Sequence, residues 1–171
     1  MSAAARFTGP AAALWAAACL SMLGAGWNAG AQTPAPNATQ GAENAPAGVE
    51  NPQRAWQHWT LNCQGCHRPD GTGSAATTPS LAGTVGRFLS VPGGREYLGR
   101  VPGVATSPLS NADLSELMNW MLWRFDKEHL PANFQPFTAA EIGQLRSAPL
   151  RLEASQMRAD LIKKADESAT P

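Results

Sequence analysis

Charged side chains are scarce in this sequence, and neither sign is in excess. The 171 residues include 13 Lys and Arg and 13 Asp and Glu, which together make up 15% of the chain. A nucleic-acid-binding domain gathers positive charge on one face or along one helix, and no such cluster of basic residues appears here. A balanced chain also lacks the opposed fields that steer strongly charged partners together. The composition therefore argues against nucleic acid as a partner.

Strand-like alternation and internal repeats are also lacking, whereas helical spacing is evident. Ser110 and Asp113 form an S-x-x-D start that resembles a capping box. The apolar residues that follow recur on one helical face, up to a helix end near Glu128: Leu114, Leu117, Met118, Met121, Leu122 and Phe125. Shorter helices are expected over 53–63, 94–101 and 138–149, and 152–164 is a candidate for a charged helix. These patterns predict an all-α fold.

The N-terminal residues have the pattern of an export signal. Arg6 supplies the positive charge before an apolar stretch, residues 11–27, and small residues at 29–31 form an A-x-A cleavage site. We therefore expect cleavage near Ala31 and a periplasmic protein. The apolar stretch is shorter than the about 20 residues that a membrane helix needs. Membrane attachment would require that the signal is retained or that Cys19 is lipidated.

The chain divides by composition into four expected segments. The second segment is rich in alanine and proline and has almost no bulky apolar side chain, so it cannot bury enough surface to offset the entropy of the chain. We expect a signal peptide (1–31), a disordered linker (32–52), a folded helical domain (53–128) and a partly helical C-terminal extension (129–171).

Cysteine is rare, and removal of the signal leaves only Cys63 and Cys66. They stand in the motif CQGCH, where His67 follows the second cysteine directly. Two intervening residues allow both thiols to add to the vinyl groups of one porphyrin, and the next residue is then placed below its plane as an axial iron ligand. The motif favours one covalently attached haem c.

Other uses of two cysteines and a histidine fit less well. A redox dithiol of the thioredoxin type needs a strand before the motif, and no strand is apparent before Cys63. Zinc needs further ligands, and the other histidines are His58 and His129, with no second CxxC. A plain disulfide is disfavoured by the tight spacing.

From residue 53 to residue 128 the sequence resembles the class I cytochrome c family. A short apolar helix precedes CQGCH, the turn PDGTG follows it, and LSNADLSELMNWMLWRF fits the last helix of that fold. The resemblance implies a small helical domain wrapped around the haem. It also implies that PSLAG, residues 79–83, contains the proline whose carbonyl orients the proximal histidine. That role would fall to Pro79, acting on His67.

The resemblance fails on the other side of the iron. Most members of the family supply a methionine from the loop before the last helix, but the corresponding segment, residues 100–110, has no methionine, histidine or lysine. Met118 or Met121 is then the candidate distal ligand, although both also complete an apolar helical stripe. Candidates for pairing with the haem propionates are Arg87, Arg95 and Arg100.

The function that the resemblance implies is electron transfer rather than catalysis. We expect an exported monohaem cytochrome that exchanges single electrons with periplasmic redox proteins, such as a dehydrogenase or an oxidase. The missing loop ligand leaves open an alternative, in which an open distal iron position serves a ligand sensor or a weak peroxidase. The extension beyond Glu128 leaves open a third, a haem-bearing subunit of a dehydrogenase complex.

Overall fold

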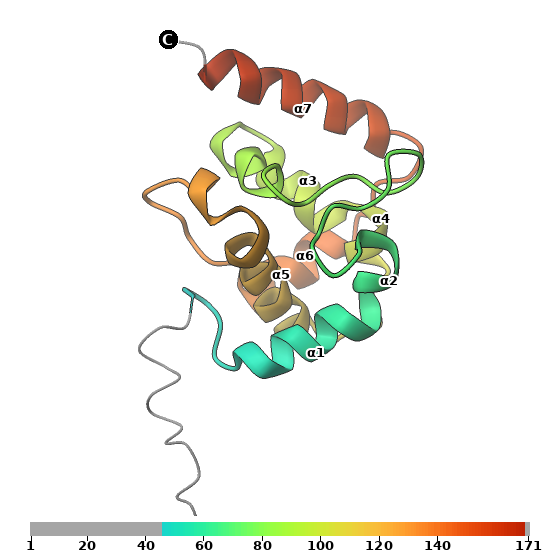
Figure 1. Ribbon diagram of the computed structural model, residues 1–171, viewed down its shortest axis with the longest axis vertical. Coiled ribbons are helices and arrows are strands. Elements are labelled where there is room, and N and C mark those ends of the chain that lie inside the picture. Colours follow the sequence, from blue (N-terminus) through green and yellow to red (C-terminus); the bar gives the residue numbers. More distant parts are fainter. Residues whose placement is uncertain (1–45, 170–171) are drawn as a thin grey trace, which may run out of the picture. The chain divides into compact units, whose positions relative to one another are not determined.

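A computed structural model describes residues 46–169, and over this range the chain folds into helices joined by turns (Figure 1). The α-helices are α1 (Pro52–Asn62), α2 (Gln64–His67), α3 (Gly94–Arg100), α4 (Pro102–Ala105), α5 (Asn111–Asp126), α6 (Ala139–Arg146) and α7 (Ala154–Ala169). The 3-10 helices are η1 (Val85–Ser90) and η2 (Lys127–His129). Within the described residues, β pairing is confined to an isolated bridge between Ser74 and Thr78. The all-α fold class is confirmed.

Helices α1 and α5 pack directly against each other and form the base of the domain. The side chain of Asn51 caps α1, and Pro52 occupies its first turn, where a missing N–H has no helical partner to lose. Trp59 of α1 is 1% exposed, and its ring lies 6.2 Å from Trp120 and 4.6 Å from Phe125 of α5. These aromatic contacts hold the segment before the CQGCH motif against α5.

Helix α5 follows the sequence expectation closely. The side chain of Ser110 accepts a hydrogen bond from the backbone N–H of Asp113, as a capping box requires. All six apolar residues of the predicted stripe are buried. The helix ends at Asp126 and continues as η2, close to the expected end at Glu128. No helix of the described range is both long enough and apolar enough for a membrane crossing.

The expected signal peptide and most of the expected linker lie outside the described residues. The last residues of that linker are packed: Val49 is buried, and the backbone N–H groups of Glu50 and Asn51 donate to one Glu116 oxygen, at 2.8 and 2.7 Å. Glu116 is a buried residue of α5. A buried carboxylate therefore fixes the segment that leads into α1.

Segment 100–110, which we expected to be a loop, contains the one-turn helix α4. Pro102 stands at its first position, where the fixed φ of proline suits a helix start. The N–H of Ala105 donates to the carbonyl of Val101 at 2.9 Å. One turn is too short for an apolar stripe to show in the sequence, so periodicity alone could not reveal this helix.

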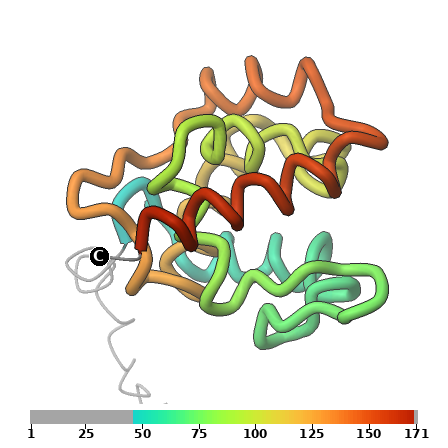
Figure 2. The backbone as a smooth tube through the Cα atoms, turned by 90° about the horizontal axis from the view of Figure 1, so that it is seen from above, coloured from blue at the N-terminus to red at the C-terminus, as the bar shows by residue number. Residues whose placement is uncertain are grey.

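Helices α6 and α7 of the C-terminal extension both pack against the rest of the domain. Helix α6 contacts α3, α4 and α5, and its Ile142 is fully buried. Helix α7 contacts η1 and α3 through the buried side chains of Leu161 and Ala165. Figure 1 shows α7 on the side of the domain opposite α1, and Figure 2 shows it lying across the front.

Candidate cofactor site

The CQGCH motif forms a single helical turn directly after α1. The N–H of Cys63 donates to the carbonyl of Trp59 at 2.9 Å, and the N–H of His67 donates to the carbonyl of Cys63 at 3.0 Å. Residues three and four positions apart share one face of a helix. Cys63, Cys66 and His67 therefore lie on one side of this turn, and all three line the same cavity.

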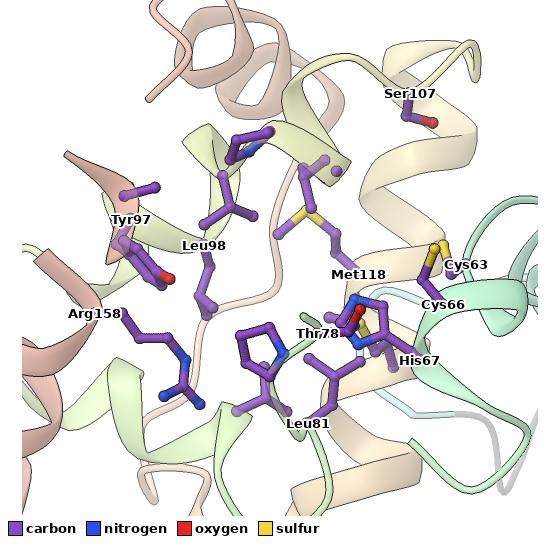
Figure 3. Close-up of a pocket in the computed structure, with 18 of the residues that line it drawn as sticks. Cys63, Cys66, His67, Thr78, Leu81, Tyr97, Leu98, Ser107, Met118 and Arg158 are labelled. Atoms are coloured by element: carbon purple, nitrogen blue, oxygen red, sulfur yellow. The ribbon is translucent and has the colours of Figure 1, made fainter. Parts of the chain in front are cut away.

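This cavity has a volume of about 480 Å³. Its walls come from α1, α2, the segment 77–81, η1, α3, α4, α5 and the C-terminal region (Figure 3). Apolar side chains make up most of the wall: Val85, Phe88, Leu98, Val101, Val104, Leu114, Leu117, Met118 and Met121. A volume within the range of about 300–1,000 Å³ and a mainly apolar lining are typical of sites that bind small molecules and cofactors.

Two residues at this cavity, Trp59 and His67, each have a buried ring nitrogen without a hydrogen-bond partner, and His67 is the one that can bind a metal. In His67 this nitrogen is Nδ1. Burial lowers the pKa of His67, while the carbonyl of Pro79 partly offsets this effect. Pro79 lines the same cavity, so the segment expected to orient the imidazole does lie beside it. A neutral imidazole that is held beside a carbonyl at the wall of an apolar cavity is suited to bind a metal.

Both cysteines are free thiols, and their environment does not favour a redox dithiol. Burial, and secondarily the charge of Cys66, raises the pKa of Cys63 to about 11. Redox-active pairs instead stabilise a thiolate, which lowers the pKa of the attacking cysteine. Over residues 46–169, no three His, Cys, Asp or Glu side chains lie close enough together to hold a metal ion. The dithiol and zinc alternatives therefore lose support.

The remaining histidines have other partners. His58 Nε2 lies 3.6 Å from Asp113 Oδ1, and His129 Nδ1 lies 2.5 Å from Asp126 Oδ1. Neither residue lines the cavity. His67 is therefore the histidine that the described structure places at the site.

Two methionines of α5 line the cavity, as the candidate distal ligands should. Met118 is 1% exposed and Met121 is 8% exposed. Figure 3 shows the Met118 side chain extending from α5 into the cavity. The segment 100–110 contributes no strong iron ligand: its lining residues are Val101, Pro102, Gly103, Val104 and Ser107. Met157 packs on the core but does not line the cavity.

The arginines expected near a cofactor carboxylate are engaged elsewhere. Arg87 pairs with Asp166, Arg95 pairs with Glu141, and Arg100 donates to the carbonyl of Ala148. The arginines that line the cavity are Arg151 and Arg158 of the C-terminal region, which the sequence reasoning missed. A signal for docking of this region existed in the helical spacing of Ala154, Met157, Leu161 and Ala165.

Gly73 permits the close approach between the turn after the motif and the Pro79 segment. It has a φ of +66°, and a Cβ atom there would lie 2.3 Å from the carbonyl oxygen of Thr78 and 2.7 Å from that of Pro79. Gly83 has a φ of +64°, but a Cβ atom there would meet nothing within 4 Å. Both glycines therefore have a left-handed backbone conformation, but only Gly73 is crowded by neighbouring atoms.

We expect Gly73→Ala to destabilise the protein more than Gly83→Ala. The left-handed backbone costs both variants about 1–2 kcal/mol, and the clash at Gly73 adds about 1–3 kcal/mol. Chemical unfolding of the purified protein, followed by far-UV circular dichroism, measures both. Equal losses in the two variants would show that the approach of the Pro79 segment does not depend on Gly73.

Comparison with known proteins identifies two similar sequences. The chain is 31% identical over 106 residues to cytochrome c-552 of Thermus thermophilus, and the match covers 52% of this chain and 81% of that protein. It is also 31% identical over 106 residues to the cytochrome c-552 of a second Thermus thermophilus strain, with coverages of 52% and 72%. No protein-family model matches the chain. No solved structure matches it significantly.

The similarity to cytochrome c-552 agrees with the helical fold and with the motif at the cavity. Two cysteines and a histidine with CxxCH spacing line one apolar cavity between the helices. The relatives are matched over most of their own length at an identity above 30%. The chain belongs to the c-type cytochrome family that cytochrome c-552 represents.

Proposed function

We propose that this protein is an exported monohaem cytochrome that carries single electrons between periplasmic redox partners. The observation that supports this proposal most directly is the convergence of Cys63, Cys66 and His67 on one apolar cavity of about 480 Å³. The imidazole of His67, which lies at the cavity wall and interacts with the carbonyl of Pro79, also supports a site for a metal-containing group. Bound haem c supplies reversible one-electron iron chemistry.

Different residues of the chain would bind different parts of the haem. The thiols of Cys63 and Cys66 would attach the haem covalently, and His67 would supply an imidazole to its iron. Pro79 lies beside that imidazole and restrains its orientation, because ligating histidines usually donate their other N–H to a carbonyl or carboxylate. The apolar wall excludes water, which disfavours the more highly charged oxidised iron and raises the reduction potential.

Met118 is our proposed distal ligand. It is nearly fully buried and extends into the cavity from α5, a different element from the one that carries His67. His67 and Met118 would then both hold the iron, and a histidine–methionine pair is typical of electron carriers. Two protein ligands also leave little rearrangement to accompany electron transfer.

The surface next to the motif suits contact with another redox protein. Cys66 is exposed, and Leu61, at the end of α1, is 81% exposed. An apolar side chain beside an exposed attachment cysteine brings a partner close to the edge of the cofactor. The formal net charge is zero, so contact would depend on this apolar region more than on long-range attraction. A dehydrogenase as donor and an oxidase as acceptor both suit such a carrier.

One observation supports a second candidate function. The segment 100–110 lines the cavity with apolar side chains and one serine, where most class I cytochromes supply their methionine. If Met118 acts only in the core, the distal position is open, and the protein binds a small ligand or peroxide. The ligand-binding experiment in the Discussion separates these two functions.

Covalent attachment and export are tested together by the mass of the mature protein. We expect a chain that starts near Gln32 and carries the mass of one haem, with the colour remaining on the protein in acidified organic solvent. Cys63→Ser combined with Cys66→Ser should abolish attachment, and Cys66→Ser alone should leave one thioether and sharply lower the yield. Extraction of the colour into the solvent would overturn the haem c assignment, and an intact N-terminus would overturn the proposed export.

A further inference from the structure

The C-terminal region closes the cavity on the side away from the two cysteines. Figure 3 shows Cys63 and Cys66 at one side of the cavity and Tyr97 and Arg158 at the other. Arg158 belongs to α7, and Arg151 comes just before this helix. Both arginines line the cavity. An apolar cavity therefore carries its cysteines on one side and positive charge on the other.

Helix α7 holds Arg158 in a defined position. Leu161 and Ala165 bury one face of the helix against η1 and α3, and Asp166 pairs with Arg87 of η1. The guanidinium carbon of Arg158 lies 5.6 Å from the centre of the Phe88 ring, within reach of a cation–π interaction. The side chain is thus supported on its apolar side and only half exposed.

The two arginines at the cavity lack the anionic partners that other arginines of the domain have. Arg54, Arg87 and Arg95 form ion pairs with carboxylates. Among residues 46–169, the side chains of Arg151 and Arg158 take part in no ion pair or side-chain hydrogen bond, and the contact found for Arg158 is the one with the Phe88 ring. Arg158 is partly buried, whereas Arg151 is exposed. A partly buried positive charge beside apolar surface, such as that of Arg158, is unfavourable unless an anion accompanies it. The arrangement points to an anionic group in the cavity.

We propose that Arg158, with Arg151 beside it, binds the propionate carboxylates of the haem, so that α7 is part of the cofactor site. This inference rests on the proposed function. The propionates of haem lie on the edge of the macrocycle remote from its vinyl groups. A haem attached through its vinyl carbons to Cys63 and Cys66 therefore directs its carboxylates away from the cysteines, toward the side where Arg158 lies. Tyr97, whose hydroxyl group is near Arg158, completes the polar end of the cavity.

Such contacts have a measurable consequence for the cofactor. Ionised propionates stabilise the oxidised iron, and a neighbouring guanidinium cancels part of that effect. Removal of the Arg158 charge should therefore lower the midpoint potential of the holoprotein. It should also change the hydrogen bonding of the propionates, which their resonance Raman bending modes report independently of electron-transfer activity.

The test compares Arg158→Gln with Lys164→Gln in the covalently loaded protein. Both substitutions remove one positive charge from α7, but Lys164 is exposed and does not line the cavity. We expect Arg158→Gln to lower the midpoint potential and shift the propionate modes, and Lys164→Gln to change neither. Arg158→Lys keeps the positive charge but replaces the planar guanidinium with an ammonium group. It should therefore preserve the midpoint potential more closely than Arg158→Gln does, while still shifting the propionate bending modes.

Unchanged potential and unchanged propionate modes in Arg158→Gln would overturn the proposal, as would an equal shift in Lys164→Gln. If Arg158→Gln yields no folded protein, the modes of Arg158→Lys decide: a shift supports the contact and an unchanged spectrum overturns it. The haem content of each variant is measured in parallel. A wild-type protein without covalent haem would refute the proposed function itself, which is a separate outcome from a failed propionate contact.

Discussion

Replacement of His67 by alanine is expected to abolish the low-spin absorption spectrum of the holoprotein. Among the described residues, His67 is the histidine that lines the cavity, and its ring interacts with the carbonyl of Pro79. If the proposed function holds, loss of the imidazole would remove the proximal ligand, while Cys63 and Cys66 would still provide covalent attachment. Absorption and electron paramagnetic resonance spectra of the ferric protein should change from low spin to high spin in nearly the whole sample.

His58→Ala and His129→Ala are the matched controls for this experiment. Both histidines lie beside aspartates and away from the cavity, so their removal should leave the low-spin spectrum intact. His129→Ala removes a contact to the buried Asp126, which affects stability rather than the spectrum. A lost low-spin spectrum in His129→Ala would instead identify that residue as an iron ligand and refute our assignment of the distal side.

Met118→Ala is expected to open the distal iron position. The wild-type ferric protein should show the red charge-transfer band of methionine ligation, and the ferrous protein should resist carbon monoxide. In Met118→Ala the band should disappear and carbon monoxide should bind rapidly, because the proposed distal ligand, which extends into the cavity, has been removed. Stopped-flow mixing with carbon monoxide and near-infrared spectra measure the two effects.

Met121→Ala is the control that separates ligation from packing. Met118 and Met121 are both buried on α5, so truncation of either one should cost about 2–5 kcal/mol of stability. Stability therefore does not distinguish them, whereas the charge-transfer band does. If the band persists in Met118→Ala and is lost in Met121→Ala, Met121 is the distal ligand and Met118 serves only in the core. Rapid binding of carbon monoxide to the wild type would favour the sensor or peroxidase function.

Local sequence patterns predicted the elements that depend on neighbouring residues. Ser110 and Asp113 marked the start of α5, and the apolar stripe that follows showed which face would be buried. The motif CQGCH was also recognisable, because its spacing alone indicates that Cys63, Cys66 and His67 act on one group. Its helical turn was not predicted and is seen in the structure. Capping and periodicity are short-range properties, and for this reason they can be recognised in a single sequence.

Contacts between distant segments decided the rest of the site. Three arginines lie nearer the motif in sequence than Arg158 does: Arg87, Arg95 and Arg100. Each of them instead forms an ion pair or a hydrogen bond with a residue of the C-terminal extension. Arg158 reaches the cavity because Leu161 and Ala165 dock α7 against η1 and α3. The sequence pattern places Met118 and Met121 on one apolar stripe, and the packing of α5 against the other walls brings both of them to the cavity. Burial and ion pairing depend on which helices meet in space, whereas helical spacing reports only which residues share a face.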